Sequence, residues 1–348
     1  MSLRVTWLLP IKDGMPFLPE TLASIEAQTY QDWEILAWDN GSTDGTLQEL
    51  KRWIPSRLPG RIVTDCPLGL GLSLAQMVLC SSTELCARID ADDINMPDRL
   101  ERQVAFLREN PQIAVVGSQQ ELIDQAGQSL GMTVPPLPLT HHDMVHGMLY
   151  RNGISHPTVL FRRSAVLESG NYHDVGPINV EDYDLWLRMA VQHQLANLNI
   201  PLVRYRIHDR STTQMAIAKN RLTRALDDRL CEHAPGLYGC RVEEARALRE
   251  RSHPSAIRVL RRIAKHLQES QPPAVDVLHS ASFLTAGRAL TAPQDVVSRL
   301  ALAGFDRRRA AVLQELACLG AAMLKNAVMR LGGPNAVAEV RRARRRWS

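Results

Sequence analysis

Three aspartates stand close together in the sequence, directly after the apolar run Leu85–Ile89. Asp90, Asp92 and Asp93 belong to the segment IDADDINMPDRL at positions 89–100. Carboxylates packed this closely repel one another, so they are tolerable in solvent or around a cation. Mg2+ and Mn2+ prefer oxygen ligands, and Mg2+ is commonly bound by one or two carboxylates plus substrate phosphates. The segment predicts a divalent-metal site that neutralises a diphosphate or, as the alternative, acids that stabilise the N-terminus of a following helix.

A second pair of acids, Glu181 and Asp182, begins an amphipathic segment with the sequence NVEDYDLWLR at positions 179–188. One interpretation is a general base that takes a proton from an acceptor hydroxyl. The other is a pair of acids in the first turn of a helix, where the helix dipole favours negative charge.

Two further segments could contact a nucleotide. Asp39 follows the apolar run Trp33–Trp38 and heads the turn sequence DNGS. Its ionised carboxylate could accept a hydrogen bond from a nucleobase imide, although a turn aspartate is also ordinary in such a place. Gly69 and Gly71 precede a helical pattern in PLGLGLS and resemble a loose phosphate-binding GxG, a weak signal by itself.

Alternating strands and helices would position these residues. Apolar runs predict strands, and helical spacing predicts helices between them, with Ser73 as one N-cap and Pro97 in one first turn. This order indicates βαβ units and a mostly parallel sheet, whose ligands bind beyond the carboxyl ends of the strands. The motifs PIKD at Pro10–Asp13, DNGS and DAD follow three such ends, so we expect one site. The predicted strands are 4–9, 33–38, 61–64, 85–89 and 113–117, and the predicted helices are 19–28, 47–54, 73–80 and 97–109.

The sequence changes character near residue 215, after which Arg, Ala and Leu dominate and strand patterns disappear. Segments 242–251, 255–267 and 308–331 read as helices. A chain of 348 residues is long enough for two domains at roughly 100–200 residues each. We therefore predict an α/β domain over 1–215 and a helical C-terminal region over 216–348.

Charge and composition exclude some classes of protein. The chain is 45% hydrophobic and 22% charged, as in ordinary globular proteins, and its net charge of +4 does not argue for a nucleic-acid partner. Five arginines fall in the last eight residues, 341–348. This tail could contact anionic lipid, with a solvated basic terminus as the alternative.

Other features bear on location. The six cysteines lack close CxxC spacing and read as reduced thiols of a cytoplasmic protein. No secretory signal is predicted. No membrane span is predicted either, since polar residues interrupt the most apolar stretch, 310–329. This stretch reads as a helix that is buried or docks on a membrane. His142 and His146 could share a zinc face but have no glutamate between them, so a polar helix start explains them. A peripheral place at the inner face of the plasma membrane stays open.

Taken in order, the motifs of residues 4–215 resemble family 2 glycosyltransferases with the GT-A fold, a Rossmann-like, mostly parallel sheet flanked by helices. The C-terminal region is outside this resemblance. The segments that carry it are LLPIKDGMPFLPETLASIEAQTYQDWEILAWDNGSTDGT (8–46), GLGLSLAQ (69–76), ARIDADDINMPDRLERQVAFLRENPQIAVVGS (87–118), HPTVLFRRSAVLESGNY (156–172), EDYDLWLRM (181–189) and YRIH (205–208).

The resemblance implies roles for individual residues of a site that binds a nucleotide-sugar. Asp39 would contact the base, Asp90 would lie near the ribose and the metal, and Asp92 would ligate Mn2+ or Mg2+. His208 would help to bind the metal or the diphosphate, and Asp182 would be the catalytic base with Glu181 beside it. The remaining implied donor-site residues are Pro10, Asp13, Gly71 and Ala91, with His156 and Trp186 lining the sugar and acceptor region.

Two departures from the family pattern concern the base. PIKD stands where relatives often have Pro-Thr-Tyr-Asn, which removes an aromatic ring that would stack on the base, and DNGS stands where they often have Asp-Asp-Gly-Ser. A UDP-sugar is the favoured donor, and the base preference stays open.

The implied reaction is a single displacement by a hexosyltransferase-type enzyme, with inversion at the anomeric carbon. The acceptor would be a hydroxyl of a glycan or lipid-linked molecule in bacterial cell-surface polysaccharide or glycoconjugate synthesis. Two alternatives are a non-catalytic scaffold that retains the fold and a sugar-phosphate nucleotidyltransferase. The second should have a glycine- and basic-rich loop after the first strand, whereas residues 10–16 hold one lysine. The oligomeric state stays open.

Overall fold

The protein is described by a computed structural model over residues 3–64, 66–131, 136–149, 151–176, 178–209, 211 and 222–249. The chain divides into two compact units, 1–148 with 152–233, and 149–151 with 234–348. The first unit contains the sheet and all the residues of the site described below. In the described part of the chain, no helix combines the length and apolar character that a bilayer crossing requires.

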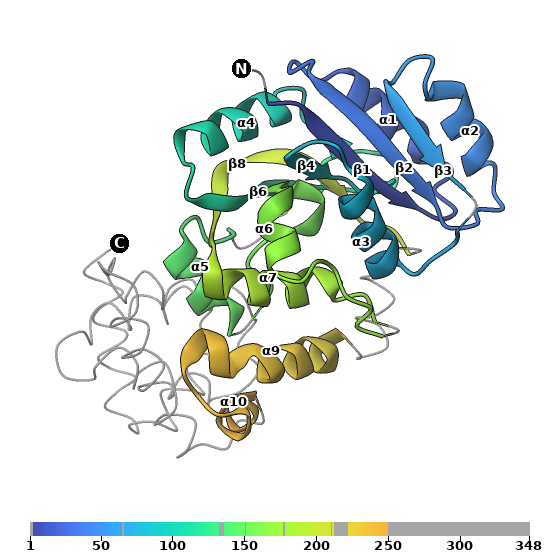
Figure 1. Cartoon of the computed structure of the whole chain (residues 1–348). Helices are drawn as coiled ribbons and strands as arrows, with labels where there is room; N and C mark the ends of the chain where they lie inside the picture. The colour runs from blue at the N-terminus through green and yellow to red at the C-terminus, as the bar shows by residue number, and fades with distance from the viewer. Residues whose placement is uncertain are drawn as a thin grey trace, which may run out of the picture. The chain divides into compact units, whose positions relative to one another are not determined.

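A sheet of eight strands forms the centre of the first unit (Figure 1). Its spatial order is β3-β2-β1-β4-β7-β6-β8-β5. The strands are β1 (Val5–Ile11), β2 (Trp33–Asp39), β3 (Gly60–Val63), β4 (Leu85–Arg88), β5 (Ile94–Asn95), β6 (Ile113–Ile123), β7 (Leu160–Arg162) and β8 (Gln194–Arg206).

The predicted βαβ order is confirmed in the first half of the chain. β1 pairs in parallel with β2 and β4, β2 pairs in parallel with β3, and β6 pairs in parallel with β8. β7 is antiparallel to both β4 and β6, and β5 is antiparallel to β8. The carboxyl ends of β1, β2 and β4 therefore meet at one edge of the sheet, where the sequence predicted the site.

Helices and one short 3-10 helix connect the strands. Figure 1 shows α1 and α2 on one face of the sheet and α3 on the other. The elements are α1 (Leu18–Glu26), α2 (Thr46–Trp53), α3 (Leu70–Cys80), α4 (Arg99–Glu109), α5 (His141–Met148), η1 (His156–Thr158), α6 (Arg163–Glu168), α7 (Glu181–Gln192), α9 (Leu222–Tyr238) and α10 (Val242–Arg249).

The burial of β1 shows that both faces of the sheet are covered at this strand. Every residue of VTWLLPI is buried, as expected for a central strand of a parallel sheet. Val5, Trp7, Leu9 and Ile11 join a core cluster with apolar residues of α1, α2 and α4. The intervening residues point to the opposite face, because side chains along a strand alternate.

Two predicted helix starts are wrong by a few residues. α3 begins at Leu70 with Gly69 as its N-cap, so Ser73 lies inside the first turn, where its hydroxyl donates to the Leu70 carbonyl over 3.0 Å. α4 begins at Arg99, after Pro97. The helices predicted at 255–267 and 308–331, the stretch 310–329 and the basic tail lie outside the described residues. α5 begins next to Thr140, whose hydroxyl oxygen accepts a hydrogen bond from the Asp143 N–H over 3.2 Å, the side-chain cap expected at a polar helix start.

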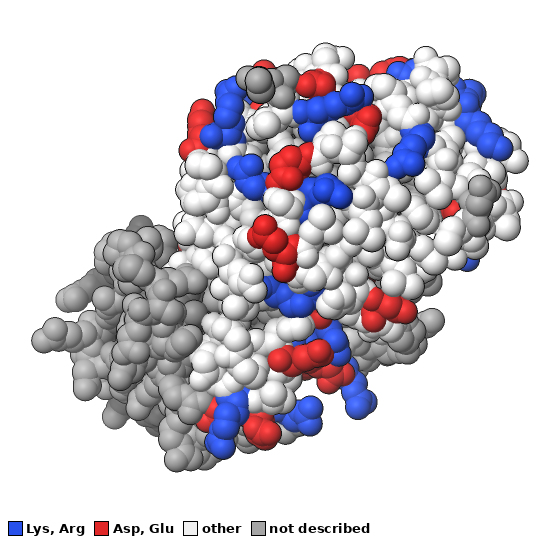
Figure 2. All heavy atoms as spheres, viewed as in Figure 1, with Lys and Arg blue, Asp and Glu red and all other residues white. Residues whose placement is uncertain are grey.

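Acidic and basic side chains are interspersed over the described residues on the face shown in Figure 2. Arg57 and Glu26 form one such exposed pair of opposite charges, at 2.5 Å. On this face, the described residues show no stripe of a single sign of the kind that marks nucleic-acid binding.

Candidate active site

A cleft of about 530 Å³ opens at the carboxyl ends of β1, β2 and β4. Its volume lies in the range of small-molecule sites, roughly 300–1,000 Å³. It is lined by Pro10, Ile11, Lys12, Asp13, Gly14, Met15, Phe17, Asn40, Leu68, Gly69, Leu70, Asp90, Ala91, Asp92, Asn179, His208 and Ser211. Six of the residues singled out from the sequence, Pro10, Asp13, Asp90, Ala91, Asp92 and His208, therefore share one cleft.

The three aspartates after β4 form a group that could hold a cation. Carboxylate oxygens of Asp90, Asp92 and Asp93 lie within 4.8 Å of one another. Asp93 is 1% exposed, its Oδ1 accepts a hydrogen bond from the Arg206 main chain, and its Oδ2 is buried with no hydrogen-bond partner among the described residues. Burial and the charges of the two other aspartates raise the pKa of Asp93 well above its usual value. A buried carboxylate oxygen without a partner beside two more acids fits a hard divalent cation.

His208 lies next to Asp92 although 116 residues separate them in the chain. The His208 Nε2 and an Asp92 carboxylate oxygen are 2.8 Å apart. The imidazole packs against the Phe17 ring with 4.8 Å between ring centroids. Arg206, which is 1% exposed, donates from its Nε to the Asp92 carbonyl over 2.8 Å and lies over the same Phe17 ring. These contacts tie the loop after β4 to the end of β8 and so fix the two candidate metal ligands relative to each other.

Arg88, the last residue of β4, is a functional candidate that the sequence reasoning missed. It is 2% exposed, and its two terminal nitrogens donate to the two carboxylate oxygens of Asp90. A usable signal existed, because a single arginine in an apolar strand, two residues before the acid, needs a buried partner.

The end of β2 forms the other part of the cleft. Asp39 is 3% exposed and accepts hydrogen bonds from the main chain and the hydroxyl of Ser42. Asp13, at φ 52°, accepts from the Thr43 N–H over 2.7 Å, and the Asn40 amide oxygen accepts from the Leu68 N–H over 2.9 Å. Asp13 and Asn40 line the cleft, whereas Asp39 is not among its lining residues.

The second acidic group forms around the N-terminus of α7. His156, Glu181 and Asp182 offer ligand atoms within 4.8 Å of one another. Burial raises the pKa of Asp182 to about 6, although the Tyr183 N–H, the Arg88 charge and the Asn152 amide act in the opposite direction. The Asn152 Nδ2 donates to the Asp182 Oδ2 over 2.7 Å. A carboxylate with this pKa is ionised at pH 7 and still basic enough to take a proton efficiently.

The two neighbouring acids of α7 are tuned differently. Burial and the charge of Asp182 raise the pKa of Glu181 to about 8, so Glu181 is mostly protonated at pH 7. Asp184 also loses solvent on burial, but the hydrogen bond from His233 and the charge of Arg188 outweigh this effect and lower its pKa to about 2. Of the three acids, Asp182 is the one whose protonation state changes just below neutral pH, as a general base requires.

Trp186 and His156 lie in the interior. Trp186 is 0% exposed, and its ring stands edge-on to the His156 ring with 6.0 Å between centroids. The sequence placed Trp186 at the sugar and acceptor region, whereas in the structure its indole belongs to the core. The reason is that α7 is buried on most of its circumference, which the sequence pattern of one amphipathic face did not reveal. His156 is 8% exposed, and its Nε2 is 3.0 Å from the Tyr172 hydroxyl.

Gly71 lies where α3 meets the loop before α7. A Cβ atom at this position would lie 2.4 Å from the His173 carbonyl oxygen and 3.3 Å from the Glu181 Cβ. His173 lies in the loop before α7, and Glu181 is the first residue of α7 and a member of the second acidic group. Gly69, two residues earlier, has nothing within 4 Å of such an atom. Of these two glycines, only Gly71 is therefore required by close packing.

Replacing Gly71 by Ala is expected to lower the free energy of unfolding by about 1–2 kcal/mol, since an overpacking cost of about 1–3 kcal/mol exceeds the helix propensity gained. Gly69→Ser is the matched control and should change stability by only a few tenths of a kcal/mol, because Gly and Ser are both favoured at an N-cap and a Cβ atom there meets nothing within 4 Å. Urea unfolding of the two variants makes the comparison. Equal stability of both would contradict the close approach at Gly71.

The raised pKa of Glu181 predicts a pH-dependent stability. Because the folded-state pKa is about 8 against a usual 4.5, folding binds a proton between these values, and stability is lost as pH rises from 4.5 to about 8. Glu181→Gln should therefore raise Tm at pH 9 by about 4 °C or more and change it little at pH 4. Thermal unfolding of both proteins at the two pH values checks this. A constant Tm difference at both pH values would mean that Glu181 ionises normally.

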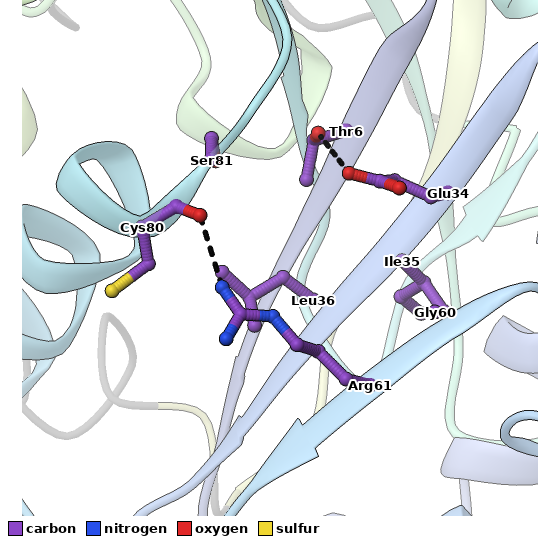
Figure 3. A pocket seen from close by; sticks show the side chains of 8 residues that line it. All are labelled: Thr6, Glu34, Ile35, Leu36, Gly60, Arg61, Cys80 and Ser81. Atoms are coloured by element: carbon purple, nitrogen blue, oxygen red, sulfur yellow. Dashed lines mark hydrogen bonds between the residues drawn. The ribbon is translucent and has the colours of Figure 1, made fainter.

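A second hollow, of about 320 Å³, lies at the opposite edge of the sheet, where β1, β2 and β3 begin (Figure 3). The Arg61 guanidinium spans it and donates to the Cys80 carbonyl over 2.9 Å, and the Thr6 hydroxyl donates to Glu34 over 3.3 Å. The polar groups of this hollow thus form two hydrogen-bonded pairs. The two groups of side chains that could hold a metal ion lie elsewhere in the described residues.

Sequence comparisons identify the family. Residues 6–166 match the family model for glycosyl transferase family 2. The chain is 30% identical over 229 residues to the O-antigen biosynthesis glycosyltransferase WbnJ of Escherichia coli, covering 63% of this chain and 87% of that protein. It is 30% identical over 191 residues to the amylovoran biosynthesis glycosyltransferase AmsE of Erwinia amylovora, covering 54% of this chain and 70% of the relative. The chain therefore belongs to glycosyl transferase family 2 and is a glycosyltransferase.

Solved structures support the fold. The mannosyltransferase PcManGT from Pyrobaculum calidifontis, in complex with GDP-Man and Mn2+, superposes with a TM-score of 0.54 at 17% identity, covering 87% of this chain and 86% of the other. S. aureus TarS 1–349, in complex with UDP-GlcNAc, superposes with a TM-score of 0.51 at 14% identity, covering 87% and 91%. The GT-A fold expected from the sequence is confirmed.

Proposed function

We propose that this protein is an inverting, metal-dependent glycosyltransferase that moves a sugar from a nucleoside diphosphate sugar to an acceptor hydroxyl. The observation that supports this most is the presence of two acidic groups that interact electrostatically: the aspartates after β4, of which Asp90 and Asp92 line the cleft, and Glu181 with Asp182 at α7, which do not line it. One group suits a cation with a diphosphate, and the other contains a base with a pKa of about 6.

The residues that line or support the cleft receive the following roles in this proposal. Asp39 and the rim at Pro10 and Asp13 hold the base, and Asp90 with Ala91 faces the ribose. Asp92 and His208 would hold Mn2+ or Mg2+, and the carboxylate of Asp92 is an oxygen ligand that suits both ions. Such an ion supplies positive charge to the departing diphosphate. Gly71 allows the close approach of α3, and His156 supports Glu181 from the interior at 3.7 Å.

The chain's own residues then perform the transfer. Asp182 accepts the proton of the acceptor hydroxyl while the oxygen attacks the anomeric carbon from the face opposite the diphosphate. The bond between the anomeric carbon and the phosphate oxygen breaks, and its electron pair leaves with the nucleoside diphosphate. One in-line displacement inverts the configuration, so an α-linked donor gives a β-linked product. The Asn152 amide holds the Asp182 carboxylate in place, and its hydrogen bond favours the ionised form.

The substrate class follows from relatives and from the cleft. WbnJ and AmsE are named for the biosynthesis of O-antigen and amylovoran, so the acceptor is proposed to be a glycan or a lipid-linked glycan of a bacterial cell-surface polysaccharide. A UDP-sugar is the favoured donor. Residues 1–215 are proposed to carry the reaction, in the cytoplasm, and the basic tail at 341–348 is proposed as a peripheral contact with anionic lipid.

The test is thermal unfolding with UDP-, GDP- and dTDP-sugars, each with and without Mn2+. A ligand that binds the folded state increases the free energy of unfolding by mass action, by about 2.7 kcal/mol at a hundredfold excess over Kd, and so raises Tm. A Tm increase with one donor that requires Mn2+ is the expected result and selects the donor for acceptor assays. An unchanged Tm with every donor, combined with absence of sugar-nucleotide hydrolysis or transfer, would favour a non-catalytic scaffold.

A further inference from the structure

The buried guanidinium of Arg88 interacts with both acidic groups of the site. Its side chain is 3% exposed and forms a two-bond fork with Asp90, whose side chain is 33% exposed and lines the cleft. Its charge also acts on Glu181 and on Asp182. One cation thus holds an acid of the donor cleft by two hydrogen bonds and acts by its charge on the two acids at α7.

The backbone around Arg88 is fixed as firmly as its side chain. The Arg88 N–H donates to the Val159 carbonyl over 3.0 Å, and the Arg88 carbonyl accepts from Arg99 over 2.8 Å. Arg99 is 0% exposed and also donates to the Val159 carbonyl over 3.1 Å. The guanidinium therefore projects from a rigid strand end, and a planar fork held in this way orients the carboxylate that it binds.

We propose that Arg88 is a positioning residue of this glycosyltransferase: it holds Asp90 as an oriented, charge-compensated acid at the donor cleft and supplies the positive charge against which the Glu181–Asp182 group is assembled. This inference rests on the proposed transfer from a nucleotide-sugar. It assigns Asp90 a different electrostatic state from Asp92, whose carboxylate faces His208 instead.

The pairing makes the effect of Asp90 depend on Arg88. With the arginine present, the oriented carboxylate contacts the donor, and its removal weakens donor binding. Without the arginine, the same carboxylate is an uncompensated charge in a partly buried place, which destabilises the fold and repels a diphosphate. Asp90→Asn is then expected to improve both properties. The sign of the Asp90→Asn effect should therefore reverse in the Arg88→Met background.

The experiment compares the wild type with Asp90→Asn, Arg88→Met, the double variant and Arg88→Lys. The first readout is Tm without ligand, and the second is the Kd of UDP, of GDP and of dTDP, each with Mn2+, by calorimetry. We expect Arg88→Met to lower Tm and to weaken binding of the preferred diphosphate about tenfold or more. The double variant should have a higher Tm than Arg88→Met and should bind the diphosphate more tightly. An Asp90→Asn effect of the same sign and size in both backgrounds would overturn the proposal.

Arg88→Lys separates positioning from a purely structural role, and it serves if Arg88→Met does not fold. Lysine keeps the charge but loses the fork, so Tm should recover most of the loss while diphosphate binding stays weakened about tenfold. Full recovery of both Tm and diphosphate binding would mean that Arg88 contributes only its charge and does not position Asp90. Arg57→Met, which breaks an exposed fork with Glu26 at 2.5 and 3.0 Å, is the control and should change Kd by less than about twofold.

The failure of the proposed function gives a different pattern. If the wild type binds none of UDP, GDP and dTDP with Mn2+, the proposed function fails, while the Tm values of the wild type, Asp90→Asn, Arg88→Met and the double variant still decide whether Arg88 compensates Asp90. If the wild type binds a diphosphate and the Tm reversal is absent, the Arg88 proposal alone is wrong.

Discussion

Asp182→Asn is expected to lower kcat by about 10³-fold and to leave donor binding nearly unchanged, because general bases contribute roughly 10²–10⁴ to rate. The amide is close in size to the carboxylate and can still accept from the Tyr183 N–H, which donates to Asp182 over 2.7 Å. It cannot take a proton from the acceptor. Steady-state transfer assays and calorimetry with the donor measure the two effects separately.

The pH dependence of the wild type gives the same residue a second test. Asp182 acts as a base only when ionised, so kcat should fall as pH decreases through about 6, its raised pKa, and this limb should disappear in Asp182→Asn. Asp174→Asn, in the exposed loop before α7, is the control and should keep kcat within about twofold. Transfer by Asp182→Asn at more than about a tenth of the wild-type rate would place the base elsewhere, with Glu181 the next candidate.

Asp92→Ala is expected to remove the metal-dependent part of donor binding, with an affinity loss of about 100-fold or more in Mn2+, since second-shell partners alone commonly cost 10–100-fold. The fold should persist, because the Asp92 side chain is 29% exposed and its carboxylate contact in the described residues is His208. Calorimetry with the donor, in Mn2+ and in chelator, measures the loss. In chelator the variant and the wild type should bind equally weakly.

Asp98→Ala is the matched control for this substitution. Asp98 is an exposed acid that pairs with Arg102 on α4, outside the cleft, so donor binding in Mn2+ should change by less than about twofold. Mn2+ paramagnetic resonance on both variants shows whether the ion itself is lost. Mn2+-stimulated turnover by Asp92→Ala at the wild-type level would remove Asp92 from the candidate metal ligands.

Much of the fold could be read from local patterns. The apolar runs of β1, β2 and β4, and the helical spacing between them, are properties of short segments and need no knowledge of distant contacts. The polar residues that follow each strand, Asp13, Asp39 and Asp90, could be placed at one edge because parallel strands end on the same side.

The sequence by itself therefore determined the family, the βαβ half of the sheet and the set of acids at its carboxyl edge. The tertiary structure alone decided the insertion of β7 antiparallel between β4 and β6, the burial of Trp186, and the partners Asn152 and Arg206, which reach Asp182 and Asp92 across 30 and 114 residues. The physical reason is that periodicity records which face of an element is buried, whereas the partner of a buried charge is set by long-range packing that no local pattern encodes.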